Sequence, residues 1–269
     1  MLSKTVLTFL VILSLSFSIH LVSPSYDDVK ENDTIFLGEI GPGQTVSILV
    51  DHLVTEGGIY GIGGTYDMAI AEDLPEGWTF RESELYQKPL QVIITADPNA
   101  TEGVYYAKVK VIDEDDGEEL GNVTFNVKIR VVMDVADFGV SPSHINTGPG
   151  QPARFEITIT NKASTSDVFQ VSATGTKKWE FIRPVFVPAK SSKTIYYEIV
   201  GNEEEDYRAR IRMVSLASDK INAEENVTVS VKSNLIWDYK ATNNGVVLFP
   251  IFEVPIYAFA GLVSNLFPG

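Results

Sequence analysis

Few side chains in this chain have the types and spacing that catalysis or metal binding requires. The chain of 269 residues has no cysteine, which excludes zinc–thiolate, iron–sulfur and thiol chemistry. Its histidines are His20, His52 and His144, too few and too scattered for a histidine-rich metal site or an internal Ser-His-Asp triad. Nothing singles out a carboxylate pair for glycoside hydrolysis. We therefore predict a protein that is not an enzyme, with no catalytic residue, no metal and no cofactor.

One acidic run has the oxygen ligands that calcium prefers. The run Asp113–Glu119, DEDDGEE, concentrates carboxylates, but it lacks the spacing of an EF-hand loop. It lies between two alternating segments, where Asp116-Gly117 is typical of a hairpin turn. A second cluster, Glu203–Asp206, occupies the matching place before a later strand. We interpret both as solvated turns rather than calcium sites.

A glycine-rich stretch, TEGGIYGIGGTYD at residues 55–67, resembles a phosphate loop only superficially. No Gly-Lys-Ser/Thr follows it, and no strand-to-helix unit surrounds it. We interpret it as a long loop at one end of a β-sandwich, where binding surfaces often lie. Its aromatic neighbours Tyr60, Tyr66 and Trp78 predict a contact site for a partner or a glycan. The alternative is that these rings are part of the core.

Four sequons could accept glycans if the chain crosses a membrane during export. They begin at Asn32, Asn99, Asn122 and Asn226. The first two lie in turn-like surroundings and are the better candidates. The other two could simply be strand residues.

The elements that would position these residues are predicted to be β-strands throughout. Period-two alternation of apolar and polar residues indicates strands with one buried and one solvated face, and no segment here has helical periodicity. Gly, Pro, Asn and Asp cluster between the alternating runs, as in a sandwich. The runs are Thr45–Val50, Val104–Ile112, Val123–Val131, Ala153–Ile159, Thr194–Ile199 and Asn226–Val231.

Three landmarks recur in the same order at an offset of about 100 residues, which indicates a duplicated domain. GPGQ occurs at 41–44 and again at 148–151, and GWTF at 77–80 matches KWEF at 178–181. YYAKVKV from Tyr105 matches YRARIRM from Tyr207. We predict two tandem sandwiches, at residues 30–133 and 137–232. The short link around Asp134 to Asp137 is expected to limit bending.

The second copy resembles a known family, the immunoglobulin/fibronectin-like CARDB-type module of archaeal and bacterial surface proteins. The matching elements are a V-S-P-S opening at 140–143, a Pro-Gly turn at 149–150, Phe155–Asn161, Asp167–Phe169, Trp179 and Tyr207–Arg212. The first copy matches more loosely and is expected to lack the V-S-P-S opening. The resemblance implies an immunoglobulin-like sandwich used for spacing, adhesion or assembly in an archaeal-type envelope, and it implies no shared active site.

Both ends of the chain have membrane-related patterns. Residues 1–25 have Lys4 before an apolar stretch and then small residues, which predicts a signal peptide cleaved near Ser23 or Ser25, or else an uncleaved anchor. Residues 233–269 form a linker and a hydrophobic tail interrupted by Pro250, Glu253 and Pro255. We expect this tail to be embedded in a membrane. The alternatives are insertion into another protein and packing on the chain's own domains.

The formal net charge of -15 argues against binding nucleic acid or anionic lipid. Taken together, the patterns predict an exported, membrane-anchored glycoprotein on the outer side of the cell envelope. It would be a structural, adhesion or complex-assembly module whose partners are the membrane and other envelope proteins. The alternative is a subunit of a surface polymer or membrane complex that inserts its tail into a neighbour. A lower alternative is a carbohydrate-binding accessory module.

Overall fold

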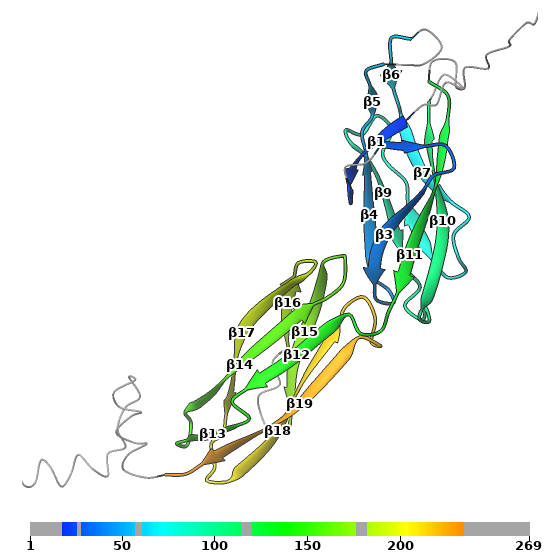
Figure 1. Ribbon diagram of the computed structural model, residues 1–269. Helices are drawn as coiled ribbons and strands as arrows, with labels where there is room; N and C mark the ends of the chain where they lie inside the picture. The colour runs from blue at the N-terminus through cyan, green and yellow to red at the C-terminus, as the bar shows by residue number, and fades with distance from the viewer. Residues whose placement is uncertain (1–17, 26–27, 57–60, 114–119, 176–181, 234–269) are drawn as a thin grey trace, which may run out of the picture. The chain divides into compact units, whose positions relative to one another are not determined.

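The computed structural model describes residues 18–25, 28–56, 61–113, 120–175 and 182–233, and these residues form strands and turns without any helix. They divide into two compact units. The main division falls between Met133 and Asp134, and the short segment Ala163–Thr165 belongs to the first unit. In Figure 1 the first unit runs from blue to green and the second from green to orange. The all-β fold expected from the sequence is confirmed. Each unit is described by itself below.

The first unit packs two sheets over one apolar core. One sheet has the order β2-β1-β4-β9-β8 and the other the order β3-β11-β10-β7. The side chains of Phe125, Ile48 and Leu90 are fully buried. A small hairpin of β5 (Leu53–Val54) and β6 (Gly64–Thr65) adds a separate ribbon. The other strands are β1 (Ser18–Ser23), β2 (Asp28–Lys30), β3 (Thr34–Ile40), β4 (Thr45–Val50), β7 (Met68–Glu72), β8 (Thr79–Arg81), β9 (Leu90–Thr95), β10 (Gly103–Ile112) and β11 (Val123–Val131).

The second unit is also a two-sheet sandwich. Its sheets have the orders β12-β14-β17 and β13-β19-β18-β15-β16. Phe155 and Phe169 are fully buried between them. The strands are β12 (Ala136–Ser141), β13 (His144–Thr147), β14 (Pro152–Asn161), β15 (Asp167–Thr174), β16 (Arg183–Val187), β17 (Ser191–Val200), β18 (Asp206–Ser215) and β19 (Asn222–Val231).

The two units share one strand plan. In each, the first strand pairs antiparallel in one sheet, and the chain then crosses to pair parallel with the last strand of the other sheet. The parallel pairs are β3 with β11 and β13 with β19. Every other described pairing is antiparallel. This arrangement of two packed sheets is that of an immunoglobulin-like β-sandwich.

The two GPGQ segments form the same turn in each unit. Proline fixes φ at the second turn position, and the following glycine adopts a positive φ, +69° at Gly43 and +73° at Gly150, which glycine tolerates best. Gln44 N–H donates to the Gly41 carbonyl at 3.2 Å, and Gln151 N–H donates to the Gly148 carbonyl at 3.1 Å. Both turns lead directly into a core strand, β4 or β14. The repeated sequence landmark therefore corresponds to a repeated turn.

A second shared feature lies at the start of β10 and β18. The Tyr105 hydroxyl donates to the Thr101 carbonyl at 2.9 Å, and the Tyr207 hydroxyl donates to the Glu203 carbonyl at 3.2 Å. A tyrosine whose hydroxyl bonds the backbone a few residues upstream is the tyrosine corner of immunoglobulin-like sandwiches. The YYAKVKV and YRARIRM match therefore reflects a shared tertiary contact.

The first sandwich begins earlier than the expected residue 30. β1 pairs with β2 and β4, and its Ile19 and Leu21 are fully buried. Residues 22–25 read V-S-P-S, as residues 140–143 do, and β1 and β12 each end at the serine before the proline. The expectation that the first copy lacks this opening is therefore wrong. A cut near Ser23 or Ser25 would remove β1, while residues 1–17 lie outside the described residues.

Candidate functional site

The aromatic contact site expected in the first sandwich is not formed by Tyr66 and Trp78. Tyr66 is 2% exposed and Trp78 is 8% exposed, and the Trp78 ring centroid lies 5.2 Å from that of Tyr105. Burial, with the charges of Asp113 and Glu31 nearby, raises the pKa of Tyr66 to about 12. The structure thus favours the alternative that these rings are core. Tyr60 lies outside the described residues.

The described residues of the two acidic clusters, Asp113–Glu119 and Glu203–Asp206, make turn contacts. Asp113 is buried, and its carboxylate accepts the Leu120 N–H at 2.8 Å across the end of the β10–β11 hairpin. Residues 114–119 lie outside the described residues. Glu203 donates its N–H to the Tyr207 hydroxyl at 3.0 Å, which ties the second cluster to the tyrosine corner. The described residues contain no group of three His, Cys, Asp or Glu side chains placed to hold a metal ion.

The histidines have separate local contacts. His20 Nδ1 lies 3.1 Å from Asp28, His52 Nδ1 lies 3.3 Å from Asp51, and His144 Nε2 lies 3.1 Å from the amide oxygen of Asn146.

All four sequon asparagines lie at exposed positions. Asn32 and Asn99 are in turns, as predicted, whereas Asn122 directly precedes β11 and Asn226 lies within β19. The Asn122 amide oxygen accepts the Asp113 N–H at 3.1 Å, so a glycan there would compete with a turn contact. Glycosylation remains a prediction at each of these positions.

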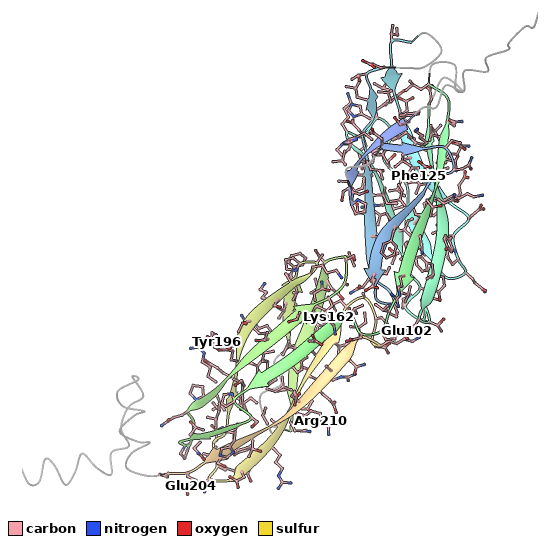
Figure 2. The ribbon with its side chains drawn as sticks, viewed as in Figure 1. Glu102, Phe125, Lys162, Tyr196, Glu204 and Arg210 are labelled. Atoms are coloured by element: carbon pink, nitrogen blue, oxygen red, sulfur yellow. The ribbon has the colours of Figure 1, made fainter. Side chains whose placement is uncertain are left out.

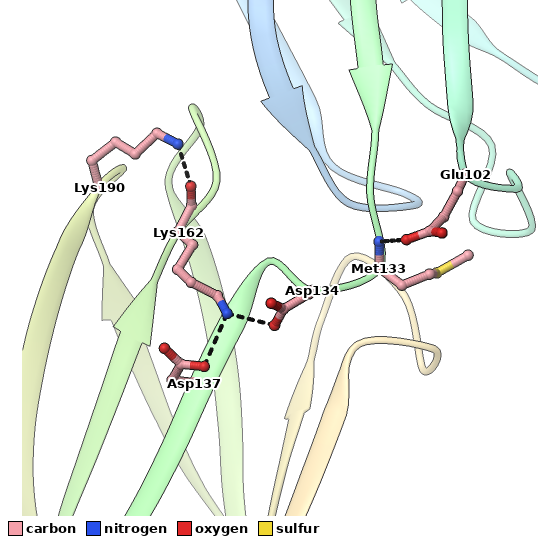
Figure 3. Close-up of polar contacts among 6 residues, drawn as sticks. All are labelled: Glu102, Met133, Asp134, Asp137, Lys162 and Lys190. Atoms are coloured by element: carbon pink, nitrogen blue, oxygen red, sulfur yellow. Dashed lines mark hydrogen bonds and ion pairs between the residues drawn. The ribbon is translucent and has the colours of Figure 1, made fainter.

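The residues at the division between the two units are each held by their own unit, as Figure 3 shows. On the first side, Met133 N–H donates to the Glu102 carboxylate at 2.9 Å. On the second side, the Lys162 ammonium bonds both Asp134 and Asp137. These ion pairs raise the pKa of Lys162, through Asp134 first and then Asp137.

Sequence reasoning did not anticipate the groove beside β17 in the second sandwich. It has a volume of ≈ 660 Å³, and its lining includes Arg154, Arg183, Lys193, Tyr196 and Glu198. Tyr196, labelled in Figure 2, is 46% exposed. The Arg154 guanidinium lies 3.8 Å from the centre of the Tyr196 ring, a cation–π contact. The groove therefore combines an aromatic face with a cluster of cations.

Two of these cations bridge the edges of the two sheets. Arg183, on β16, donates to the Tyr196 carbonyl of β17 at 2.8 Å, and Lys193, on β17, donates to the Phe186 carbonyl of β16 at 3.1 Å. Both acceptors are neutral. Among the described residues, no carboxylate forms an ion pair with Arg154, Arg183 or Lys193. The groove is thus locally cationic on a chain whose net charge is -15.

No sequence pattern marks this groove, because its residues come from three strands. Arg154 is far from Lys193 along the chain, and the pairing of β14 with β17 brings their strands together, while Arg183 comes from β16. The one weak sequence signal was that Arg183 and Lys193 lie close together on a chain that is otherwise strongly acidic.

The expected membrane tail is not covered by the described residues. Pro250, Glu253 and Pro255 lie outside the described residues, and so does Trp179. In the described ranges between residues 18 and 233, no helix is long and apolar enough to span a bilayer.

Comparison with known proteins gives only distant structural likenesses. No protein-family model and no curated protein matches the chain. It is similar to a chimeric titin Z1Z2 with 9% identity, covering 81% of this chain and 99% of that one, at a TM-score of 0.35. It is also similar to titin A168–169, with 7% identity, coverage of 81% and 100%, and a TM-score of 0.26. A β-glucosidase from Listeria innocua has 18% identity, with coverage of 37% of this chain and 16% of that one, at a TM-score of 0.26.

The resemblance of the second sandwich to the CARDB-type module stays a prediction. The immunoglobulin-like fold rests on the strand order and on the two tyrosine corners described above.

Proposed function

We propose that this chain is a non-enzymatic, exported and membrane-anchored envelope protein whose two immunoglobulin-like sandwiches act as a structural or complex-assembly module. The observation that carries the proposal is the repetition of one sandwich plan, with the same turn and the same tyrosine corner in each copy. Repetition of one sandwich plan is expected of a chain whose role is to space and present surfaces.

The proposed export requires a signal peptide that ends earlier than Ser23. A signal compatible with the first sandwich must end before Ser18, because β1 supplies the buried Ile19 and Leu21. We expect N-terminal sequencing of the mature protein to start at or before Ser18. A start at Tyr26 would mean that β1 is lost on export.

Cell fractionation tests the location. We expect the full chain in the membrane fraction, accessible to protease added outside intact cells, and released by detergent. A chain lacking residues 245–269 should lose membrane retention while its two sandwiches remain folded. Recovery of the full chain from the cytoplasm with residues 1–17 intact would contradict the proposal.

A second candidate function is a subunit of a surface polymer or membrane complex assembled by strand insertion. The position of β17 favours it: among the described residues β17 is the last strand of its sheet, and a sheet edge can accept a strand from another chain. The same truncation distinguishes the candidates. Loss of polymers, with the truncated monomer still at the membrane, supports the subunit.

A further inference from the structure

The β17 edge carries backbone groups that no described strand uses. β17 is the last strand of the order β12-β14-β17, and its only described pairing is with β14. The bond from Arg183 shows that the Tyr196 carbonyl points away from β14. In an antiparallel strand, alternate residues point their N–H and C=O groups to the same side. Thr194 and Glu198 therefore share the outward direction of Tyr196.

The first sandwich shows what fits at the same position. β4 and β14 both follow a GPGQ turn, so their partners β9 and β17 are equivalent. In the first sandwich β8 pairs along β9, with Thr79 opposite Thr95 and Arg81 opposite Ile93. The corresponding stretch of β17 is Glu198–Val200, and both of these residues line the groove.

The charges select the kind of strand that would bind. Arg154, Arg183 and Lys193 present cations to an incoming chain, and Glu198 is the one acidic residue among the described residues that line the groove. Two copies meeting edge to edge would bring six cations together, so self-pairing is disfavoured, as it is for many lysine-bearing edges. An acidic strand would be attracted instead.

We propose that the β17 edge binds an extended, acidic peptide segment of a partner protein by strand addition. The incoming backbone pairs with Thr194, Tyr196 and Glu198. Its amide replaces Arg183 at the Tyr196 carbonyl, which frees the guanidinium for a carboxylate of the partner. This inference rests on the assembly role proposed above and names the chemistry of the partner.

The outward-facing backbone groups of β17 favour a peptide over an anionic polysaccharide as the ligand. Outward-facing amides on alternate residues repeat at about 7 Å, which matches the repeat of a strand. A polysaccharide would be attracted by the cations but would not need the Thr194 amide. Binding of a polysaccharide is therefore an outcome that the test must separate.

The binding test uses the full chain in detergent and a fluorescent peptide of about eight residues in which glutamate alternates with threonine or valine. Reversing charge with Arg183→Glu and Lys193→Glu together should weaken binding about tenfold or more. Arg208→Glu, an exposed change on β18, is the matched control and should leave binding within about twofold.

A second pair of variants tests the backbone. Thr194→Pro removes an outward amide without touching the pairing with β14, and it should weaken binding about tenfold. Thr194→Ala loses the same hydroxyl contact with Thr158 but keeps the amide, so it should bind like the parent. Equal binding by both variants would overturn strand addition, as would tighter binding of polygalacturonate than of the peptide at equal charge.

Hydrogen exchange reports whether the edge is already occupied. The Thr194, Tyr196 and Glu198 amides should exchange rapidly in the free chain and become protected on peptide binding. Protection in the free full chain would show that the chain covers its own edge, and loss of that protection after removal of residues 245–269 would identify the tail as the occupant. Either result overturns the proposal. Peptide binding in vitro does not depend on cell location, so its failure is distinguishable from failure of the fractionation test.

Discussion

The two sandwiches differ in the strand that follows β7 in the first and its equivalent β15 in the second. In the first sandwich that strand, β8, pairs with β9 of the opposite sheet, whereas in the second sandwich β16 pairs with β15 itself. β8 pairs with Ile93–Thr95, and β16 pairs with Asp167–Val171. The same edge is therefore covered in one copy and bare, among the described residues, in the other. A shared plan fixes the strands that bury the core. It leaves the sheet edges free to differ, and the edges are where a partner strand can add.

The largest expected effects test whether the two sandwiches are independent folding units. Phe125→Ala in β11 and Phe155→Ala in β14 each empty a fully buried site, at a cost of about 3–5 kcal/mol. Each change should lower one thermal transition and leave the other in place. Differential scanning calorimetry of both variants and the parent measures this. If both transitions move together in either variant, the two cores are coupled and the comparison of separate copies fails.

The core strands of both copies could be predicted from sequence, because alternation directly reports one buried face. Thr45–Val50 and Val123–Val131 were predicted with the bounds that the structure gives them. β16 was not predicted, since Pro184 interrupts a short segment with no clear alternation. β1 was assigned to the leader because its buried Ile19 and Leu21 continue an apolar stretch. Local pattern cannot separate an export signal from a first strand.

The candidate site could be predicted much less well. Aromatic residues such as Tyr66 and Trp78 occur both in binding loops and in cores. Only the packing shows that these two are buried. The cations of the β17 groove meet through strand register and through the sheet chosen by β16. Register between distant strands is a property of the whole fold, so single-residue patterns could not show it.

A second prediction concerns alkaline pH, where the first sandwich should lose stability that the second keeps. The pKa of Tyr66 is raised to about 12, above the unfolded value near 10. Its contribution is fully present below pH 10 and is lost as pH rises through about 12, because the unfolded tyrosine ionises first. The loss should reach roughly 2 kcal/mol. Tyr66→Phe should flatten this dependence in urea titrations between pH 9 and pH 12, and an unchanged dependence would contradict the assignment to Tyr66.

A third prediction compares the tyrosine corners. Tyr105→Phe and Tyr207→Phe each remove a hydroxyl bond to a backbone carbonyl, at a cost of about 1 kcal/mol. Each hydroxyl has a second partner, the exposed Thr101 hydroxyl at 3.2 Å for Tyr105 and the part-buried Glu203 N–H at 3.0 Å for Tyr207. Tyr207→Phe should cost more, because the Tyr207 ring is only 8% exposed and its second partner is a backbone amide. Denaturant unfolding of each variant measures the two costs. The prediction fails if the two costs are equal or if Tyr105→Phe costs more.

The smallest effects concern two surface lysines, one in each unit, that have carboxylate partners. Asp73 raises the pKa of Lys108 through a hydrogen bond and its charge, and Asp134 with Asp137 raises that of Lys162. Because both folded pKa values lie above the unfolded value, the contribution of each pair is present at neutral pH and is lost as pH rises through the folded pKa. Asp134→Asn should lower the Lys162 pKa in an NMR titration and leave Lys108 unchanged, while Asp73→Asn should do the converse. Lys162 should keep part of its raised pKa in Asp134→Asn, because Asp137 remains at 2.9 Å. A complete return to the ordinary lysine value would mean that Asp137 does not hold the ammonium by itself, and that Asp134 is the residue that ties Lys162 to the start of the second sandwich.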